Sequence, residues 1–207
     1  MTRIYFVRHA QPDPSCGYNP DFPLTELGKN DALTAADVLK DKDISAVYSS
    51  SYLRAVQTVT PFAEEAGLEI IKEYSLRERT GGNWQSSFEN YAEYINAQIE
   101  DISCKVEGGE SLEEVQERCM ETIEQIIAEN DGKAVVVGIH GMALATILMH
   151  YFPGFGTKDF YQIVDLMPLI LKLDIEDGKC ESYGIELAIK RIYPNGYLKL
   201  SDTLKGK

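Results

Sequence analysis

Short apolar runs alternate along this chain with stretches of helical spacing, and this alternation constrains the fold more than any other sequence feature. The run 134–139 is apolar almost without interruption, which predicts a strand buried on both faces of a sheet. Shorter runs at 4–7, 44–48 and 68–71 predict further strands. Strands that alternate with helices are typical of an α/β fold with a mainly parallel sheet.

Helices are predicted between these strands by capping residues and by apolar side chains at helical spacing. Thr25 predicts the start of a helix that reaches about residue 40, and Ser111 with Glu114 forms a capping-box pattern that opens another. Pro61 is expected to kink or split a third helix over 52–65. The remaining predictions are helices over 86–101 and 142–151, and antiparallel strands at a sheet edge over 169–175, 182–188 and 196–200. No repeat or linker is found in 1–207, so a single domain is expected.

The charge balance excludes two classes of partner. The chain has 20 Lys and Arg against 33 Asp and Glu, a formal net charge of −13. Binding to nucleic-acid phosphates depends on Lys and Arg that displace counterions, so no nucleic-acid partner is expected. An anionic membrane surface would repel the chain for the same reason.

The cysteines indicate a reducing compartment. Cys16, Cys104, Cys119 and Cys180 lie far apart and form no C-x-x-C pair. The first apolar run is too short for a signal peptide, and no stretch reaches the ~18 apolar residues of a membrane span. We therefore expect reduced thiols and a cytoplasmic protein, with two disulfides as the alternative.

Two of the three histidines follow predicted strands directly. His9 comes after the first strand and His140 after the strand 134–139. Ligands of open parallel sheets bind beyond the carboxyl ends of the strands, so both side chains are expected at one site. Arg8 lies beside His9, and Arg54 lies one turn into the helix after the second strand. Guanidinium groups suit tetrahedral oxyanions, and the sequence therefore predicts a phosphate site.

Other interpretations of these residues stay open. Either histidine alone could simply cap a strand, and Arg54 could pair with one of the many surface acids. His150 lies in an apolar helical stretch and is expected to be structural. A metal site is not expected, because the histidines lack the close spacing of metal ligands and no Cys or Asp cluster joins them.

The loop 76–85 supplies a carboxyl group to the predicted site. It holds Glu78, paired glycines and the only tryptophan of the chain, Trp84. Transfer of a phosphoryl group from an alkoxide leaving group needs a proton donor, and a carboxyl group can serve. Trp84 could instead fill the core.

At these positions the sequence resembles the histidine phosphatase superfamily, which includes the phosphoglycerate mutases. The resemblance covers roughly residues 2–174 and consists of several short motifs in the family's order. These are Arg8-His9-Ala10-Gln11, Leu24-Thr25-Glu26-Leu27-Gly28, Ser50-Ser51-x-x-Arg54-Ala55-x-Gln57-Thr58, Leu76-Arg77-Glu78, Gly109-Glu110-Ser111 and Ile139-His140-Gly141.

The resemblance implies a three-layer α/β/α fold with a mainly parallel central sheet and an antiparallel edge near the C-terminus. It also implies that His9 is the catalytic nucleophile and becomes phosphohistidine, and that Glu78 is the general acid and base. Arg8, Arg54, His9 and His140 would bind the substrate phosphate, with His140 also counted as catalytic. No metal and no other cofactor would be needed.

Some positions depart from the family pattern. Ala10 stands where the family has Gly. The family often has an Asn about seven residues after its Arg-His pair, and this Asn is missing here. Ser15 and Cys16 stand near that place, and Asn19 lies further on. Gly82-x-Trp84-Gln85 resembles the G-x-W-E pattern of the small phosphatase branch rather than the R-H-Y-G of the mutases.

We therefore expect a phosphomonoester hydrolase that acts on a small metabolite, with residues 78–110 as a substrate-specificity lid. Between Ser86 and Glu110 six acidic residues stand against Lys105 alone, which predicts a leaving group that is not anionic. The alternatives are a phosphoglycerate mutase and a catalytically inactive module that binds phospholigands. A homodimer stays open.

Overall fold

Within residues 1–16 and 19–192, which this computed structural model describes, six strands form one sheet. The strands are β1 (Thr2–Arg8), β2 (Ile44–Ser50), β3 (Ile70–Glu73), β4 (Ala134–Ile139), β5 (Leu166–Glu176) and β6 (Lys179–Lys190). Their order is β3-β2-β4-β1-β5-β6. The strands β3, β2, β4 and β1 are parallel, β5 is antiparallel to β1, and β6 is antiparallel to β5. The strand expected at 196–200 lies outside the described residues.

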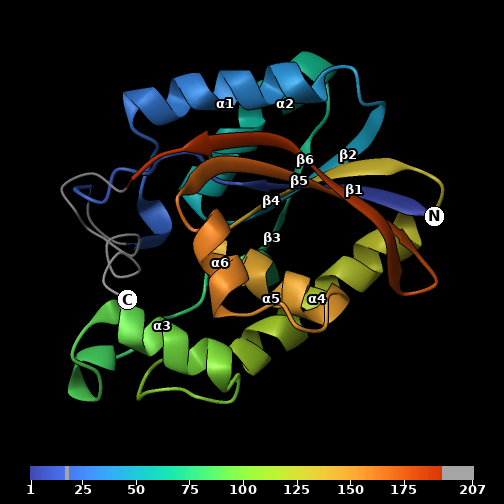
Figure 1. Cartoon of the computed structure of the whole chain (residues 1–207). Helices are drawn as coiled ribbons and strands as arrows, with labels where there is room; N and C mark the ends of the chain where they lie inside the picture. Colours follow the sequence, from blue (N-terminus) through green and yellow to red (C-terminus); the bar gives the residue numbers. More distant parts are fainter. Residues whose placement is uncertain (17–18, 193–207) are drawn as a thin grey trace.

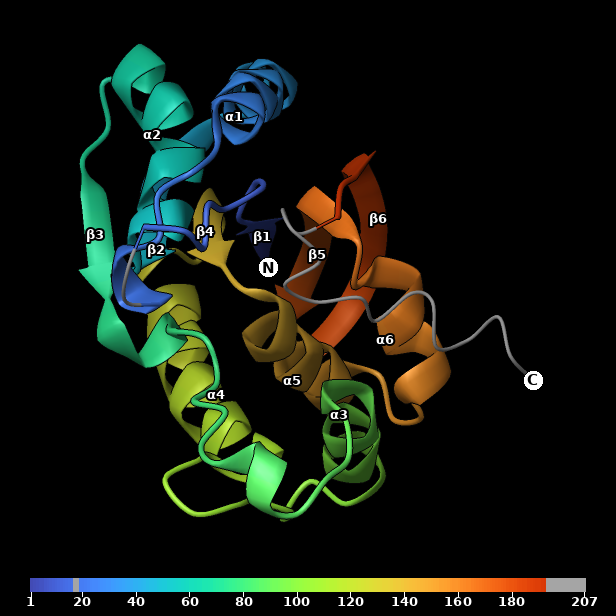
Figure 2. The ribbon, with the colours of Figure 1, turned by 90° about the vertical axis from the view of Figure 1, so that its left-hand side faces the viewer.

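Helices cover both faces of the sheet (Figure 1). On one face lie α1 (Glu26–Leu39) and α2 (Leu53–Ala66), whose apolar side chains pack on Tyr5 and Val136. On the other face lie α4 (Leu112–Glu129) and α5 (Gly141–Tyr151). Two shorter helices, α3 (Tyr91–Glu100) and α6 (Thr157–Ile163), pack on α5; α3 lies away from the sheet, whereas α6 lies beside β5 and β6 (Figure 2). The three-layer α/β/α fold with an antiparallel edge is confirmed.

The predicted caps account for the beginnings of two helices. The Thr25 hydroxyl accepts a hydrogen bond from the Gly28 amide at the start of α1. Ser111 and Glu114 exchange the reciprocal hydrogen bonds of a capping box at the start of α4. Each cap satisfies backbone N–H groups that have no partner inside the helix.

Of the two effects expected at Pro61, the split is wrong, because α2 is one helix from Leu53 to Ala66. Proline removes a single backbone hydrogen bond here, the one to the carbonyl of Gln57. Val59 and Phe62 on the same helix are buried against the sheet, and tertiary packing of this kind outweighs a local propensity.

Three other elements differ from the sequence-based expectation. The strand β3 is shifted by two residues toward the C-terminus. The stretch 86–101 becomes helical only at Tyr91, after a short 3-10 helix at Trp84–Ser86. The helix α6 was not predicted, because its seven residues bury only Phe160 and show no helical repeat.

The four cysteines are free thiols, as the sequence predicts. None of the helices in the described ranges is both long enough and apolar enough to span a bilayer.

Candidate active site

The order of the strands brings the predicted site residues together at one sheet edge. Because β4 lies between β1 and β2, Arg8 is paired with Ile139, and Ser49 with Gly138. The carboxyl ends of the three strands therefore lie side by side. His9 directly follows β1, His140 directly follows β4, and Ser50 is the last residue of β2. The His9 amide still donates to the Ile139 carbonyl at 3.0 Å, which keeps the two chain segments in register past the strand ends.

His9 presents a free nitrogen lone pair. Its ring is fully buried, and Nδ1 lies 2.8 Å from the Ala10 carbonyl oxygen. A carbonyl only accepts hydrogen bonds, so Nδ1 carries the proton of the neutral ring and Nε2 carries the lone pair. Nε2 has no hydrogen-bond partner among residues 1–16 and 19–192. Burial lowers the pKa of His9 well below its ordinary value, and the positive charges of Arg54 and Arg8 lower it further.

Alanine is accommodated at position 10, where the family has glycine. The family's Gly at this position could adopt a positive φ, but Ala10 is not among the described residues with positive φ. Its side chain is buried, its carbonyl accepts from His9, and its amide donates to the Thr58 hydroxyl at 2.9 Å. The departure from the family pattern is therefore accommodated without backbone strain.

His140 lies opposite His9. The two ring centroids are 5.3 Å apart, and the rings are inclined by 55°. His140 is fully buried, its Nε2 lies 2.7 Å from the Ser50 hydroxyl, and its Nδ1 has no partner in the described part of the chain. Burial lowers its pKa well below the ordinary value, and the charge of Arg54 contributes in the same direction.

Both predicted arginines are buried beside these rings. Arg8 uses Nη1 to donate to the carbonyls of Ile163 and Val164, at 2.8 and 2.7 Å, at the C-terminal end of α6. Its guanidinium lies against Gly141, where a β-carbon would come within 3.2 Å of Nη2. Arg54 is 3% exposed, and its Nη1 donates to the Asn19 carbonyl at 2.8 Å. Two positive charges are thus fixed next to His9.

Glu78 is held at the N-terminus of α5, the same helix that His140 caps. Its carboxylate accepts hydrogen bonds from the amides of Met142 and Ala143, both at 3.1 Å, and from the Arg79 amide at 2.9 Å. The helix therefore positions the carboxylate and the second histidine together.

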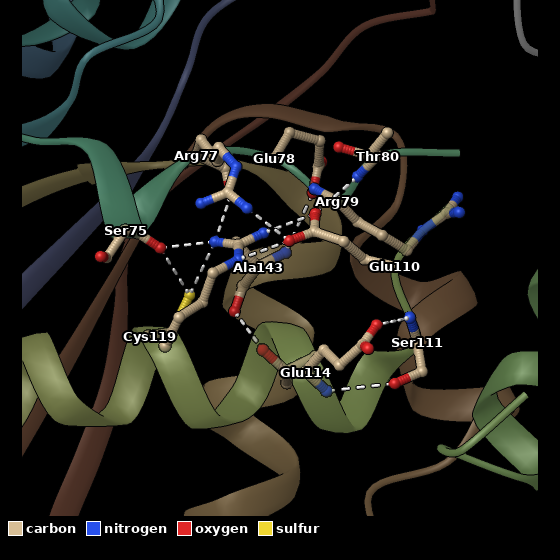
Figure 3. A network of polar contacts seen from close by, with 12 residues as sticks. Ser75, Arg77, Glu78, Arg79, Thr80, Glu110, Ser111, Glu114, Cys119 and Ala143 are labelled. Atoms are coloured by element: carbon tan, nitrogen blue, oxygen red, sulfur yellow. Dashed lines mark hydrogen bonds and ion pairs between the residues drawn. The ribbon is translucent and has the colours of Figure 1, made fainter. Parts of the chain in front are cut away.

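A buried ion network below Glu78 fixes the loop that carries it (Figure 3). Arg118 of α4 donates to the carbonyls of Ser75 and Arg77, and its guanidinium pairs with Glu110. Glu110 also accepts from Arg77 and from the Thr80 amide. Burial alone would raise the pKa of Glu110, but the hydrogen bonds from Arg118 and Thr80 outweigh it, and the pKa lies below its ordinary value.

A pocket of about 500 Å³ opens over Arg54 and Glu78. Most of its wall comes from the segment after Glu78, and the complete lining consists of Pro12, Asn19, Phe22, Arg54, Glu78, Arg79, Gly81, Gly82, Trp84, Gln85 and Tyr91. Gly82 has φ +62° and packs where a β-carbon would lie 2.4 Å from the Gly109 amide, so this position requires glycine. Trp84 lines the pocket and contacts the ring of Tyr91, with their centroids 5.3 Å apart.

The predicted acidic filter does not lie at this pocket. None of the six acids between Ser86 and Glu110 is part of its lining. Glu110 forms ion pairs with Arg77 and Arg118. Glu89, Glu93 and Glu100 line a separate depression along α3. Charge counted along a segment does not reveal which face carries it, so the lining of this pocket gives no support to the expected repulsion of an anionic leaving group.

Sequence reasoning missed a cation in this wall, Arg79. It is 4% exposed, its Nη2 donates to the Tyr91 hydroxyl at 2.6 Å, and its guanidinium stacks 4.8 Å from the Tyr94 ring centroid. Its Nε and Nη1 are buried without an acceptor among the described residues. In the sequence, the position of Arg79 directly after Glu78 was the feature that could have identified it as a site residue. Asn19, which lines the pocket, offers its backbone to Arg54 near the place of the missing family Asn.

No cluster of three or more His, Cys, Asp and Glu side chains suited to a metal ion occurs in the described ranges. The charges that face the buried histidines come from Arg8 and Arg54 instead.

Comparison with known proteins identifies the family. The model of the histidine phosphatase superfamily (branch 1) matches residues 4–184. Phosphoserine phosphatase 1 of Hydrogenobacter thermophilus is 28% identical over 84% of this chain and 93% of its own length. Glucosyl-3-phosphoglycerate phosphatase of Mycobacterium tuberculosis is 28% identical over 70% of this chain and 73% of its own length. The solved structure of mycobacterial hydrolase 1 has the same fold, with a TM-score of 0.73, 22% identity and coverage of 92% of this chain and 99% of its own. This chain therefore belongs to the histidine phosphatase superfamily, branch 1.

Proposed function

We propose that this phosphomonoester hydrolase transfers the phosphoryl group of a small substrate first to Nε2 of His9 and then to water. The observation that carries the mechanism is the state of His9: a buried, neutral ring whose Nδ1–H is bound to Ala10 and whose Nε2 lone pair is uncommitted. Covalent catalysis of this kind divides one difficult displacement into two easier ones.

Arg8, Arg54 and His140 would bind the three non-bridging phosphoryl oxygens. The guanidinium charges stabilise the negative charge spread over these oxygens in the transition state. Burial lowers the pKa of His9 most, and the same charges that attract the phosphate lower it further because they oppose protonation of the ring.

Glu78 would handle the proton in both steps. In the first, the Nε2 lone pair attacks phosphorus, the bond to the leaving oxygen breaks, and protonated Glu78 gives its proton to that oxygen. In the second, the Glu78 carboxylate removes a proton from water, the water oxygen attacks phosphorus, and the phosphorus–nitrogen bond breaks. The position of Glu78 in the pocket wall, at the N-terminus of α5, supports this assignment.

The substrate would carry a second anionic group that reaches Arg79. A buried guanidinium in a pocket wall, whose Nε and Nη1 have no hydrogen-bond acceptor among the described residues, suits an anionic group such as a carboxylate. Phosphoserine and glucosyl-3-phosphoglycerate, which two relatives are named for, each combine a phosphate with a carboxylate. We therefore propose a small phosphorylated carboxylic acid as the substrate class.

The segment 78–110 would determine specificity within a single domain that spans 1–207. The described residues from Glu78 to Tyr91 supply most of the pocket wall, whereas the phosphate-binding residues come from the sheet edge. The net charge of −13 supports a small-molecule substrate rather than a nucleic acid or an anionic membrane.

The first experiment measures hydrolysis of p-nitrophenyl phosphate across pH 4 to 9 by the wild type and by His9→Ala. The proposal predicts turnover by the wild type and none by the variant. Phosphate binding without wild-type turnover would favour a binding module, and undiminished turnover by His9→Ala would refute the nucleophile assignment. Product analysis with 3-phosphoglycerate separates hydrolysis from a mutase reaction, since only hydrolysis releases inorganic phosphate.

A further inference from the structure

We infer that Ser50 is a positioning residue that fixes His140 as the tautomer with its proton on Nδ1, so that His140 donates a hydrogen bond to the substrate phosphate. The tautomer follows from contacts alone, whereas its effect on turnover rests on the function proposed above.

The hydroxyl of Ser50 has two partners in the described chain. The Tyr52 amide donates to Oγ at 3.3 Å, and His140 Nε2 lies 2.7 Å from Oγ. An amide N–H can only donate, so it occupies a lone pair of the hydroxyl and leaves its proton free. Within residues 1–16 and 19–192, Nε2 is the one acceptor within hydrogen-bond distance of that proton. The hydroxyl therefore donates to Nε2, and the proton of the neutral imidazole lies on Nδ1.

The opposite tautomer would leave two groups in unfavourable states. If Nε2 carried the proton and donated to Ser50, the hydroxyl proton would be buried without an acceptor, since Ser50 is fully buried. A buried donor without a partner costs about 1–3 kcal/mol. Nδ1 would then direct a lone pair, rather than an N–H group, at the oxygens of a bound phosphate.

The two active-site histidines thus differ in the nitrogen that they present. His9 is fixed by an acceptor, the Ala10 carbonyl, and presents the lone pair of Nε2. His140 is fixed by a donor, the Ser50 hydroxyl, and presents the N–H group of Nδ1. The chemical type of the fixing partner therefore makes one ring a nucleophile and the other a hydrogen-bond donor.

The position of Ser50 supports this role. It is the last residue of β2, next to the end of β4, and the Tyr52 ring packs edge-on against His140 with centroids 5.2 Å apart. The neighbouring Ser49 is also fully buried, but its hydroxyl donates to the Ser50 carbonyl, and among the described residues it makes no hydrogen bond to His140. Ser49→Ala is therefore a matched control for Ser50→Ala.

The direct test is nitrogen NMR of histidine-labelled protein at neutral pH, with His140 assigned by comparison with His140→Ala. The wild type, Ser49→Ala and Ser50→Thr should show the Nδ1–H tautomer, and Ser50→Ala should show a mixture or the Nε2–H form. Wild-type protein with the Nε2–H form would overturn the inference, as would an unchanged tautomer in Ser50→Ala.

Kinetics on p-nitrophenyl phosphate supply the second readout. Ser50→Ala should lower kcat/KM about 10- to 100-fold, by analogy with the range found for partners that orient metal-binding histidines. Ser50→Thr, which keeps the hydroxyl, should retain most of the activity, and Ser49→Ala should stay within about twofold of the wild type. Equal losses in Ser50→Ala and Ser49→Ala would indicate a packing effect and contradict the inference. A wild type that lacks turnover but shows the Nδ1–H tautomer would refute the proposed function and leave the tautomer assignment intact.

Discussion

The rings of His9 and His140 face each other with their centroids 5.3 Å apart, and each has one nitrogen without a partner in the described residues. They reach this position from the ends of β1 and β4, which are neighbours in the sheet although 130 residues lie between the two histidines in sequence. Burial beside Arg8 and Arg54 keeps both rings neutral. This pair is the centre of the proposed phosphoryl transfer.

The neutrality of these histidines has a consequence for stability. Their pKa values in the folded protein lie well below the ordinary value near 6.5, so the unfolded chain binds more protons once the pH falls below 6.5. The free energy of unfolding should therefore decrease from pH 6.5 downward, by up to about 1.4 kcal/mol per pH unit for each ring. Urea unfolding of the wild type and His9→Asn at pH 7.5 and 5.5 measures this dependence. The variant should lose less stability than the wild type, and an identical pH dependence would show that His9 titrates normally.

Arg79 should discriminate between substrates by their carboxylate. Arg79→Met should lower kcat/KM for phosphoserine about 10- to 100-fold, as expected for the loss of charge-assisted hydrogen bonds. Phosphoethanolamine, which has the same amine and phosphate but no carboxylate, is the matched substrate and should be hydrolysed within a few-fold of the wild-type rate. Equal losses on both substrates would place Arg79 outside substrate recognition.

The ion network around Glu110 should stabilise the loop that carries Glu78. Glu110→Gln leaves Arg77 and Arg118 without their shared counter-charge in a largely buried site. We expect a loss of about 3 kcal/mol in stability and a lower kcat, because breaking a buried ion pair leaves uncompensated charge. Glu114→Gln is the control, since Glu114 is half-exposed and glutamine also completes a capping box. If thermal melts show both variants equally stable, the network does not hold the loop.

Asp174 should stabilise the junction of β1 and β5. Arg3 donates to its carboxylate at 2.6 Å and holds the pKa of Asp174 at about 2, despite the opposing effect of burial. Because this pKa lies below the ordinary 3.8, the stabilisation is complete above pH 3.8 and is lost as the pH falls toward 2. Asp174→Asn should therefore cost about 2 kcal/mol at pH 7 and much less near pH 2.5. Denaturant titrations at the two pH values check this, and a cost that does not change with pH would contradict it.

The sequence predicted the layers of the fold and the close approach of His9 and His140, because both depend on local patterns. Residues 134–139 show a buried strand directly, and His9 and His140 mark the ends of strands that the parallel topology places side by side. Pro61 was misjudged because propensity says nothing of the sheet that α2 packs against. Arg79 and the acids of α3 were misjudged because side-chain direction in an irregular loop depends on tertiary contacts, such as those of Gly82 with Gly109.

The central claim, a phosphohistidine on His9, is tested most directly by rapid chemical quench followed by mass spectrometry of the peptides. During turnover of p-nitrophenyl phosphate by the wild type, the peptide that contains His9 should carry one phosphoryl group that is labile in acid and stable in base. His9→Ala should show neither this modification nor turnover. Steady turnover by the wild type without any modification of His9 at the shortest quench times, or turnover that survives in His9→Ala, would contradict the mechanism.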